Sequence, residues 1–505
     1  MTAGKCGTVP FAMALERELK LGVWPGFALP DLAGIADGAT VGEPVERRLE
    51  ATYYDTADLR LLRRGVTVRC RRGEGAGATW TAKLPVKSRA PGLARTEVNV
   101  NAGPARMPRL FADIVRGWAL GAALSPVAQL NTARRTIQLR DAAGGVLAMI
   151  EDDEVSILRG ERVAARFREL EVELTEAAPE PVLAAVAERL RAAGAQAVDQ
   201  VPKLVHALGA PALEAWDLAP RPAGGTTAEV VTARLTAATA QIVDHHAAVV
   251  LGEGPEGVRR MRAGARRLRA DLRTFAPLLD GDAGPAARDG LRWVVDELSR
   301  VRDLDVLMAQ LAGSAAAASS GALLDRLADE RGRAMRRLKR ILRGAPYAAL
   351  LEQVAALAAE PPVDSAKAGR PAAEVVPALV RRPLRRLRAE VDALPGDPDG
   401  DALDALRGPV RRLRFAVEAA APVAGSPARR ALRELAAFED VVVGHHRARA
   451  ALDRLRALAE GAPPAEAWAA GVLAGVQLER AAASRSGLRR AWDHAARPSL
   501  WRWAR

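Results

Sequence analysis

The sequence contains few residues of several kinds, and each shortage excludes a class of protein. Cys6 and Cys70 are the only cysteines among 505 residues, which excludes a disulfide scaffold and a zinc site built on cysteine. No run of about 18 apolar residues occurs, so we expect no membrane-spanning helix. The N-terminal residues lack the apolar segment of a secretory signal, and we therefore predict a protein of the reducing cytoplasm.

Aromatic residues are also scarce, at 4%, whereas Ala, Leu and Arg are abundant, a composition that favours helices. Lys and Arg together number 74 and Asp and Glu 61, which gives a net charge of +13. A chain of this charge attracts polyanions such as nucleic acid, anionic lipid or polyphosphate. The arginine-rich segments carry almost no aromatic side chains that could stack on bases, which argues against nucleic acid.

The pattern of apolar residues changes along the chain and predicts two domains. Residues 11–207 alternate with a period of two, which predicts strands, with helical patterns between some of them. Residues 208–228 are rich in Pro, Gly and Ala and are interpreted as a linker. From about residue 229 to residue 505 the period is 3.6, which predicts an all-helical domain.

A second stretch rich in Pro and Gly, residues 360–374, divides the helical domain into two parts. The segments 261–272 and 406–417 share one pattern, in which an apolar residue and an arginine precede a run containing Arg-Leu-Arg. The recurrence predicts a duplicated helical bundle.

In the strand-forming domain, the charged residues of each strand share one face. These positions are Glu16, Glu18 and Lys20; Arg69 and Arg71; Lys83; Arg95 and Glu97; and Glu169, Glu171 and Glu173. A solvated sheet face is one interpretation. Carboxylates, however, concentrate on the first and last strands and basic residues between them. A sheet curled with this face inward would form a charged tunnel, in which carboxylates hold a hard divalent cation and Lys and Arg hold phosphate.

The run Glu16-Arg-Glu18-Leu-Lys20 resembles the ExExK signature of the CYTH superfamily, also called triphosphate tunnel metalloenzymes. Residues 53–72 (YYDTADLRLLRRGVTVRCRR), the WTAKLP run, the Arg95-x-Glu97 pair, the ExExE run and Pro202-Lys203 follow in the order that the family shows. The resemblance implies an antiparallel eight-stranded barrel over residues 11–207. It also implies hydrolysis or cyclisation of a triphosphate with Mg²⁺ or Mn²⁺.

The resemblance also implies roles for individual residues. The implied metal ligands are Glu16, Glu18, Asp153, Glu169, Glu171 and Glu173, and the implied phosphate contacts are Lys20, Arg69, Arg71, Lys83, Arg95, Arg135 and Lys203. Glu171, Glu173 and Lys20 are the expected catalytic residues, with a carboxylate orienting the attacking water. Asp152 is a second candidate beside Asp153, and Arg134 beside Arg135. His206 stands where the family usually has an arginine.

In the helical domain, arginines recur at helical spacing. Arg259, Arg262, Arg266, Arg269 and Arg273 fall on one face of a helix predicted over 258–275, and Arg407, Arg411 and Arg414 repeat the pattern. A solvated basic face would explain one such helix, with arginine stems covering apolar surface. The recurrence favours a groove that binds a polyanion.

This domain resembles the CHAD domain, an all-helical module often fused behind a CYTH domain. The segments around residues 255–275 and 406–418 carry the resemblance, together with the run Arg302–Val306 (RDLDV). It implies binding of inorganic polyphosphate through a basic channel. Arg259 and Asp404 stand where the family has its histidines; the first change keeps a cation and the second removes one.

The sequence therefore predicts a metal-dependent triphosphatase whose helical domain binds polyphosphate and associates the chain with polyphosphate granules. The alternatives are an adenylate cyclase of the same family and a polyphosphate-binding scaffold without catalysis. Inorganic, thiamine and nucleoside triphosphates share one anionic tail, so the sequence does not choose among them, and it does not give the oligomeric state.

Overall fold

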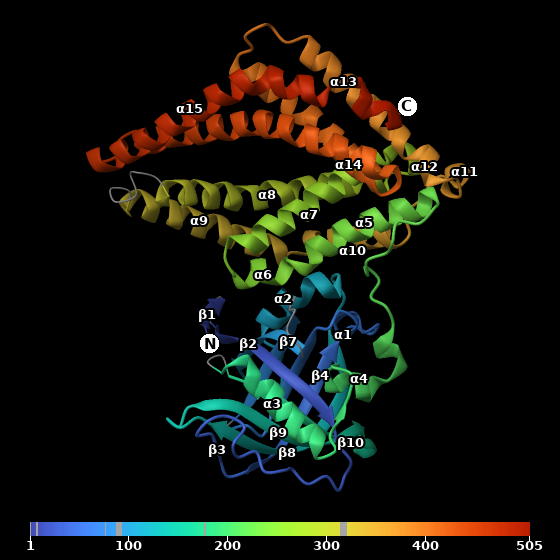
Figure 1. The fold of residues 1–505 in the computed structure, drawn as a ribbon, viewed down its shortest axis with the longest axis vertical. Helices are drawn as coiled ribbons and strands as arrows, with labels where there is room; N and C mark the ends of the chain where they lie inside the picture. Colours follow the sequence, from blue (N-terminus) through green and yellow to red (C-terminus); the bar gives the residue numbers. More distant parts are fainter. Residues whose placement is uncertain are drawn as a thin grey trace. The chain divides into compact units, whose positions relative to one another are not determined.

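The computed structural model of the chain describes residues 2–6, 9–75, 77–86, 93–175, 178–313 and 321–504. The chain divides into two compact units, Met1–Asp217 and Leu218–Arg505. Figure 1 shows the strands of the first unit in blue to teal and the helices of the second in green to red. The division falls within the segment 208–228 that the sequence predicts as a linker.

The first unit is built on a closed antiparallel sheet. Its long strands are β2 (Val9–Gly22), β4 (Val45–Asp55), β5 (Thr67–Arg72), β6 (Ala78–Pro85), β7 (Leu93–Asn101), β8 (Ser125–Arg140), β9 (Val146–Arg159) and β10 (Arg162–Leu174). They pair in the order β2, β10, β9, β8, β4, β5, β6, β7, and β7 pairs back with β2. The ring confirms the predicted eight-stranded barrel. Three short strands, β1 (Thr2–Cys6), β3 (Thr40–Val41) and β11 (Gln196–Ala197), pair at its margins.

The strands turn their apolar faces outward, where helices cover them. Helix α3 (Glu180–Ala192) places Val186 in one buried cluster with Ile150 of β9 and Val172 of β10. Helix α2 (Arg109–Ala119) packs Phe111 beside Trp80 of β6, with the ring centroids 6.2 Å apart. Because successive side chains of a strand point to opposite faces, the charged residues are left on the inner face.

One end of the barrel interior is filled by apolar side chains. Tyr53 of β4, Leu130 of β8 and Val155 of β9 pack there with Leu204 of helix α4 (Lys203–Leu208) and with side chains from the α1 region (Arg60–Arg63). The cluster leaves Lys203, the first residue of α4, at the inner margin of this plug. A 3₁₀ turn, η1 (Ala210–Leu213), follows α4.

The second unit is mostly helical, as predicted. Its helices are α5 (Thr227–Asp244), α6 (His246–Leu251), α7 (Pro255–Thr274), α8 (Ala283–Ala312), α9 (Gly321–Leu342), α10 (Ala345–Ala359), α11 (Ser365–Ala368), α12 (Ala372–Val375), α13 (Arg381–Asp392), α14 (Gly400–Ala459) and α15 (Pro464–Ala495), with 3₁₀ segments η2 (Ala276–Leu278), η4 (Pro377–Val380) and η5 (Pro498–Ala504). Helix α5 begins with a capping box in which Thr226 and Glu229 satisfy each other's backbone N–H groups.

The two similar sequence segments lie on α7 and on the first part of α14, and these helices pack against each other. Helix α14 bends sharply at Gly425, whose φ of 64° is left-handed. Glycine adopts this conformation without the steric cost of a Cβ atom, so the bend occurs where the residue permits it.

Candidate active site

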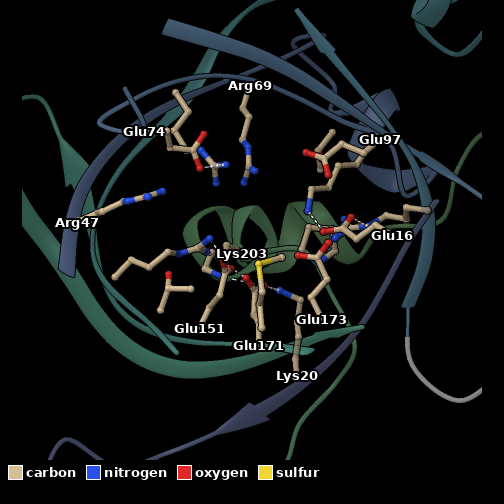
Figure 2. Close-up of a pocket in the computed structure, with 18 of the residues that line it drawn as sticks. Glu16, Lys20, Arg47, Arg69, Glu74, Glu97, Glu151, Glu171, Glu173 and Lys203 are labelled. Carbon is tan, nitrogen blue, oxygen red and sulfur yellow. Dashed lines mark hydrogen bonds and ion pairs between the residues drawn. The ribbon is translucent and has the colours of Figure 1, made fainter. Parts of the chain in front are cut away.

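The barrel interior holds a cavity of about 360 Å³ whose wall consists mostly of charged side chains. Figure 2 shows the two kinds of charge partly separated around it. Glu151, Glu171 and Lys203 lie on one side, and Arg47 and Arg69 lie across from them. The predicted inward face of the strands therefore lines one cavity.

Three carboxylates from neighbouring strands lie close enough together to share one ion. Glu151 and Asp153 of β9 and Glu171 of β10 offer oxygen atoms that all lie within 4.8 Å of one another. They meet because Glu171 is paired directly with Glu151, while Asp153 is two residues further along on the same face. We call Glu151, Asp153 and Glu171 the carboxylate cluster.

Buried lysines neutralise this cluster. The Lys203 Nζ atom lies 3.0 Å from Asp153 Oδ2, 2.8 Å from Glu171 Oε1 and 2.6 Å from Glu169 Oε1. Lys20 on β2 contacts Glu171 and lies 3.3 Å from Glu169 Oε1. Lysine is rarely buried without such partners, and here both ammonium groups are almost fully enclosed.

Ion pairs together influence the pKa values of Glu171, Lys20 and Lys203 more strongly than burial does. Burial would raise the pKa of Glu171, but Lys20, Lys203 and Arg134 outweigh it and hold that pKa well below 4.5. Burial would lower the pKa values of Lys20 and Lys203, but the carboxylates, Glu171 foremost, raise both above 10.5. Glu171, Lys20 and Lys203 are therefore charged at neutral pH.

Glu173, next along β10 on the inner face, is protonated more readily. Burial, and then the negative charge of Glu16, raise its pKa to about 8. Glu173 lies near Glu16 in Figure 2. Without a metal, this carboxyl group holds a proton at neutral pH and can exchange it close to physiological conditions.

The ExExK glutamates form a second charged group with residues of β6 and β7. Lys83 donates to Glu16, and Arg95 donates to Glu18, with the Arg95 Nε atom 3.7 Å from Glu16 Oε2. Glu16 and Arg95 are directly paired across β2 and β7. The Glu16 Oε2 atom is buried and accepts no hydrogen bond, so it has capacity for a further cation.

Arg69 and Arg71 of β5 form the basic side of the cavity. The Nε atoms of both are buried and make no hydrogen bond. Arg71 pairs with Glu74, yet burial and the neighbouring Arg69 still lower its pKa. Guanidinium groups with unused N–H donors inside an enclosed cavity suit phosphate oxygens.

The structure corrects one of the predicted phosphate contacts. Arg135 is exposed on the outer face of β8, whereas Arg134 points inward. The Arg134 guanidinium donates to both oxygens of Asp153, at 2.7 and 2.6 Å, and also contacts Glu151 and Glu171. The alternation of residues in β8 could have predicted this difference. Arg135 shares its face with Ile137 and Leu139, which pack into the outer core.

The paired aspartates separate in the same way. Asp153 is fully buried in the carboxylate cluster, while Asp152 accepts two hydrogen bonds from Arg168, at 2.9 and 2.7 Å, on the other face of the sheet. Glu151 was missed by the sequence analysis, although it lies two residues before Asp153 and so shares its face. His206 is exposed and packs on Phe167, so it does not replace the family's arginine inside the barrel.

The residues present fit a divalent cation. The carboxylate cluster offers only oxygen donors, as Mg²⁺ and Mn²⁺ prefer. The Glu16 Oε2 atom, which accepts no hydrogen bond, offers another on a different side. Glu169 is buried and pairs with Lys203 and Lys20. It does not belong to the carboxylate cluster, whose oxygen atoms lie close enough to bind one ion. The six predicted ligands are thus spread over more than one position around the cavity.

The predicted arginine stripe of the second unit is half-buried at its centre. Arg262 and Arg266 of α7 lie among Arg411 and Arg414 of α14. We call Arg262, Arg266, Arg411 and Arg414 the arginine cluster. Two carboxylates contact the cluster. Glu439 pairs with Arg414 at 2.6 Å and lies 3.8 Å from Arg411, and Glu418 pairs with Arg414 at 2.9 Å.

Arginines of this region repel one another. Burial, and then the positive charges of Arg411 and Arg262, lower the pKa of Arg266, and burial and Arg407 lower that of Arg411. Burial and Arg273 likewise lower the pKa of Arg269. A bound polyanion would relieve this repulsion.

The ends of the stripe differ from the prediction of one continuous line. Arg259 is exposed and donates to Glu256 on its own helix, and Arg273 is exposed. Arg407 contacts His446, whose Nδ1 atom lies 3.2 Å from Asp404 Oδ1. Asp404 stands where the family has a histidine, and the side chain of His446, from a later part of α14, lies beside it.

Comparisons with known families agree with both units. The family model of the CYTH domain matches residues 14–205, and that of the CHAD domain matches residues 233–456. A Mycobacterium tuberculosis protein, Rv2226, is 29% identical over 81% of this chain and 83% of its own length.

Two solved structures resemble about half of the chain. One, PptA from Streptomyces chartreusis, is 27% identical and covers 54% of this chain and 100% of its own, with a TM-score of 0.42. The other is the CHAD domain from the plant Ricinus communis, which is 25% identical and covers 54% of this chain and 93% of its own, with a TM-score of 0.46.

The fold and the cavity define a protein of the tunnel-barrel class, in which an enclosed charged barrel precedes a helical domain. The chain belongs to the proteins that join a CYTH domain to a CHAD domain. Among the helices of the described ranges, none combines the length and the apolar character needed to cross a membrane.

Proposed function

We propose that the barrel is a divalent-metal-dependent triphosphatase that releases orthophosphate from inorganic triphosphate or a related triphosphate. The observation that carries the proposal is the cavity itself, in which Glu151 and Glu171 lie across from Arg69 and which Arg71 also lines. A metal and several cations around one phosphate chain accelerate hydrolysis of a phosphoanhydride by neutralising the charge that develops on its oxygens. The cavity provides ligands for the metal and donors for the phosphates together.

When bound at the carboxylate cluster, Mg²⁺ or Mn²⁺ would supply neutralisation of the charge that develops on the phosphate oxygens. Glu151, Asp153 and Glu171 would hold it. Arg69, Arg71, Lys83, Arg95 and Lys20 would hold the phosphate chain in line for attack. In its ionised form, which predominates above a pH of about 8, Glu173 would orient the attacking water and accept its proton.

The second proposal concerns the helical unit, which would bind inorganic polyphosphate through the arginine cluster. The lowered pKa values of Arg266 and Arg411 support it, because a chain of phosphates would replace arginine–arginine repulsion by attraction. Such binding would hold the protein at polyphosphate granules in the cytoplasm.

The lining of the cavity supports a phosphate chain over a nucleotide. Among the described lining residues, Tyr53 is the only aromatic side chain, and burial within the apolar plug fixes its position. An adenylate cyclase would need a place for adenine beside the triphosphate. We therefore expect inorganic triphosphate to be hydrolysed faster than ATP.

The test is phosphate release from inorganic triphosphate, thiamine triphosphate and ATP, each with Mg²⁺ or Mn²⁺. We expect orthophosphate from all substrates that are cleaved, with inorganic triphosphate the fastest. Formation of cyclic AMP and pyrophosphate from ATP would instead identify a cyclase. No release from any substrate by the folded protein would leave polyphosphate binding as its function.

A further inference from the structure

Lys203 occupies an unusual position in the cavity. It is the first residue of α4, directly after Pro202, and its side chain extends from the apolar plug toward the carboxylate cluster. Its single Nζ atom lies within 3.0 Å of Asp153, Glu169 and Glu171. Both Lys203 and Pro202 also line the cavity, so the ammonium group borders the space where a substrate would lie.

Two of the carboxylates that hold Lys203 belong to the cluster that could hold a metal. The oxygen atoms of Glu151, Asp153 and Glu171 lie within 4.8 Å of one another, and Lys203 contacts Asp153 and Glu171 at 3.0 and 2.8 Å. Mg²⁺ requires its oxygen ligands at about 2.0–2.1 Å, in near-octahedral order. An ion seated on these carboxylates would therefore draw the oxygen atoms inward and displace the ammonium group.

The other cations around the cluster are held differently. Arg134, on the adjacent strand, donates two parallel hydrogen bonds to Asp153. This geometry holds the planar guanidinium group in one orientation. Lys20 lies on β2, which pairs with β10, and it contacts Glu171 there. Arg134 lies on β8, on the other side of β10 from β2. Lys203 is a point charge on a flexible stem at the margin of the cavity, so it can leave the carboxylates for a phosphate.

We propose that the Lys203 ammonium group is an internal substitute for the divalent cation, and that metal and phosphate bind the barrel cooperatively as a result. With the cavity free of phosphate, Lys203 neutralises the cluster and weakens metal binding. A phosphate chain gives the ammonium group a new partner, and the carboxylates become available to the metal. The inference rests on the proposed function, since it takes the carboxylate cluster as the metal site.

The direct test is binding of Mn²⁺ to the full chain without any phosphate, measured by the loss of the free-ion signal in electron paramagnetic resonance. We expect Lys203→Gln to bind Mn²⁺ about tenfold or more tightly than the unmodified protein, because one positive charge beside the ion is removed. Lys203→Arg keeps the charge and should bind Mn²⁺ as weakly as the unmodified protein. Arg135→Gln removes the same charge from the outer face and should leave the affinity unchanged.

Equal Mn²⁺ affinities in Lys203→Gln and the unmodified protein would overturn the inference. Tighter binding by Arg135→Gln as well would also overturn it, since net charge would then explain the effect. Metal-dependent hydrolysis can persist in either case, so these failures are distinct from failure of the proposed function. Conversely, tighter binding by Lys203→Gln in a protein that hydrolyses nothing would refute the triphosphatase and support the cation substitution.

A second measurement on the unmodified protein covers the case in which Lys203→Gln does not fold. Brief acetylation followed by mass spectrometry reports how far each lysine is accessible. Saturating Mg²⁺ should increase labelling of Lys203 several-fold relative to Lys367, a half-exposed lysine of the second unit. Unchanged labelling of Lys203 at a Mg²⁺ concentration that saturates the protein would contradict displacement by the metal.

Discussion

The barrel and the arginine cluster both gather positive charge, but they balance it in opposite ways. In the barrel, carboxylates stand among the basic groups, and the pKa values of Lys20, Lys203 and Arg134 are raised despite burial. In the arginine cluster, burial and neighbouring arginines lower the pKa values of Arg266 and Arg411. Carboxylates neutralise the buried cations of the barrel. In the arginine cluster they neutralise Arg414, whereas the charges of Arg266 and Arg411 are only partly balanced.

The difference indicates what each region requires from a ligand. A phosphate chain entering the barrel must replace existing ion pairs, and a metal that takes over the carboxylates makes this exchange favourable. Under the proposed function, a phosphate chain on the arginine cluster would meet Arg266 and Arg411, whose charges are only partly balanced, and would need no metal. The comparison therefore predicts that changes in one region affect hydrolysis and changes in the other affect binding.

The largest effect is expected from Glu18→Gln. The change removes the acceptor of Arg95 and one carboxylate of the ExExK run, and we expect phosphate release from triphosphate to fall about 10²–10³-fold. Polyphosphate binding by the same variant should be unchanged. Glu154→Gln, the same substitution on an exposed glutamate of β9, is the matched control. Loss of binding together with hydrolysis would show that the two regions are not independent.

The two neighbouring arginines of β8, one inside the barrel and one outside, give a matched pair of variants. Arg134→Gln removes the fork that orients Asp153, and we expect hydrolysis to fall about 10–10²-fold. Arg135→Gln alters the neighbouring, outward residue and should retain full activity. Equal losses in the two variants would contradict the assignment of Arg134 to the interior.

A similar reduction is expected in binding when arginines of α7 are removed. The triple variant Arg262→Gln, Arg266→Gln and Arg269→Gln should weaken polyphosphate binding about 10–10²-fold at low salt. The slope of log affinity against log salt should also decrease by about 2, because fewer counterions are released. The control removes three exposed arginines of α9, at positions 333, 336 and 340. An equal loss in the control would mean that net charge, rather than the arginine cluster, governs binding.

The smallest effect concerns a buried carboxylate outside both sites. Burial raises the pKa of Asp271 on α7 from 3.8 to about 6, although Arg234 donates to it at 3.0 Å. Its protonated form is therefore favoured in the folded state, and its contribution to stability is lost as the pH rises from about 4 through 6. The full shift corresponds to about 3 kcal/mol.

Asp271→Asn resembles the protonated form and should raise the unfolding temperature at pH 8, with a gain that shrinks below pH 6. Thermal unfolding followed by circular dichroism at several pH values measures this. Asp289→Asn, at an exposed position of α8, should show no such dependence. A gain for Asp271→Asn that does not vary with pH would refute the ionisation as its cause.

Period-two alternation predicts the strands and which of their residues share a face. Alternation alone places Glu16, Glu18 and Lys20 on one face of their strand, and Glu169 and Glu171 on one face of theirs. The resemblance to the CYTH family adds that this face lines the inside of a barrel. Arg134 and Arg135 were also separable by parity, since Ile137 and Leu139 mark the outer face. The carboxylate cluster was not, because Glu151 joins Glu171 only through the register of β9 against β10.

Helical periodicity predicts which residues share a face of a helix, but it does not predict which of them a neighbouring helix buries. It predicts the arginine stripe on α7, but the exposure of Arg259 and Arg273 depends on which neighbouring helices cover each turn. The contact of His446 with Asp404 joins residues 42 positions apart in α14, and the bend at Gly425 lies between them. No local pattern of residues specifies such a contact.

One experiment tests the contrast between the two regions directly. Phosphate release from inorganic triphosphate and binding of long-chain polyphosphate are measured in the same preparation, first with Mg²⁺ and then with excess EDTA. We predict that EDTA abolishes hydrolysis and leaves polyphosphate bound. Hydrolysis that continues in EDTA, or polyphosphate that is released by it, would contradict the division of a metal-dependent barrel from a metal-independent arginine cluster.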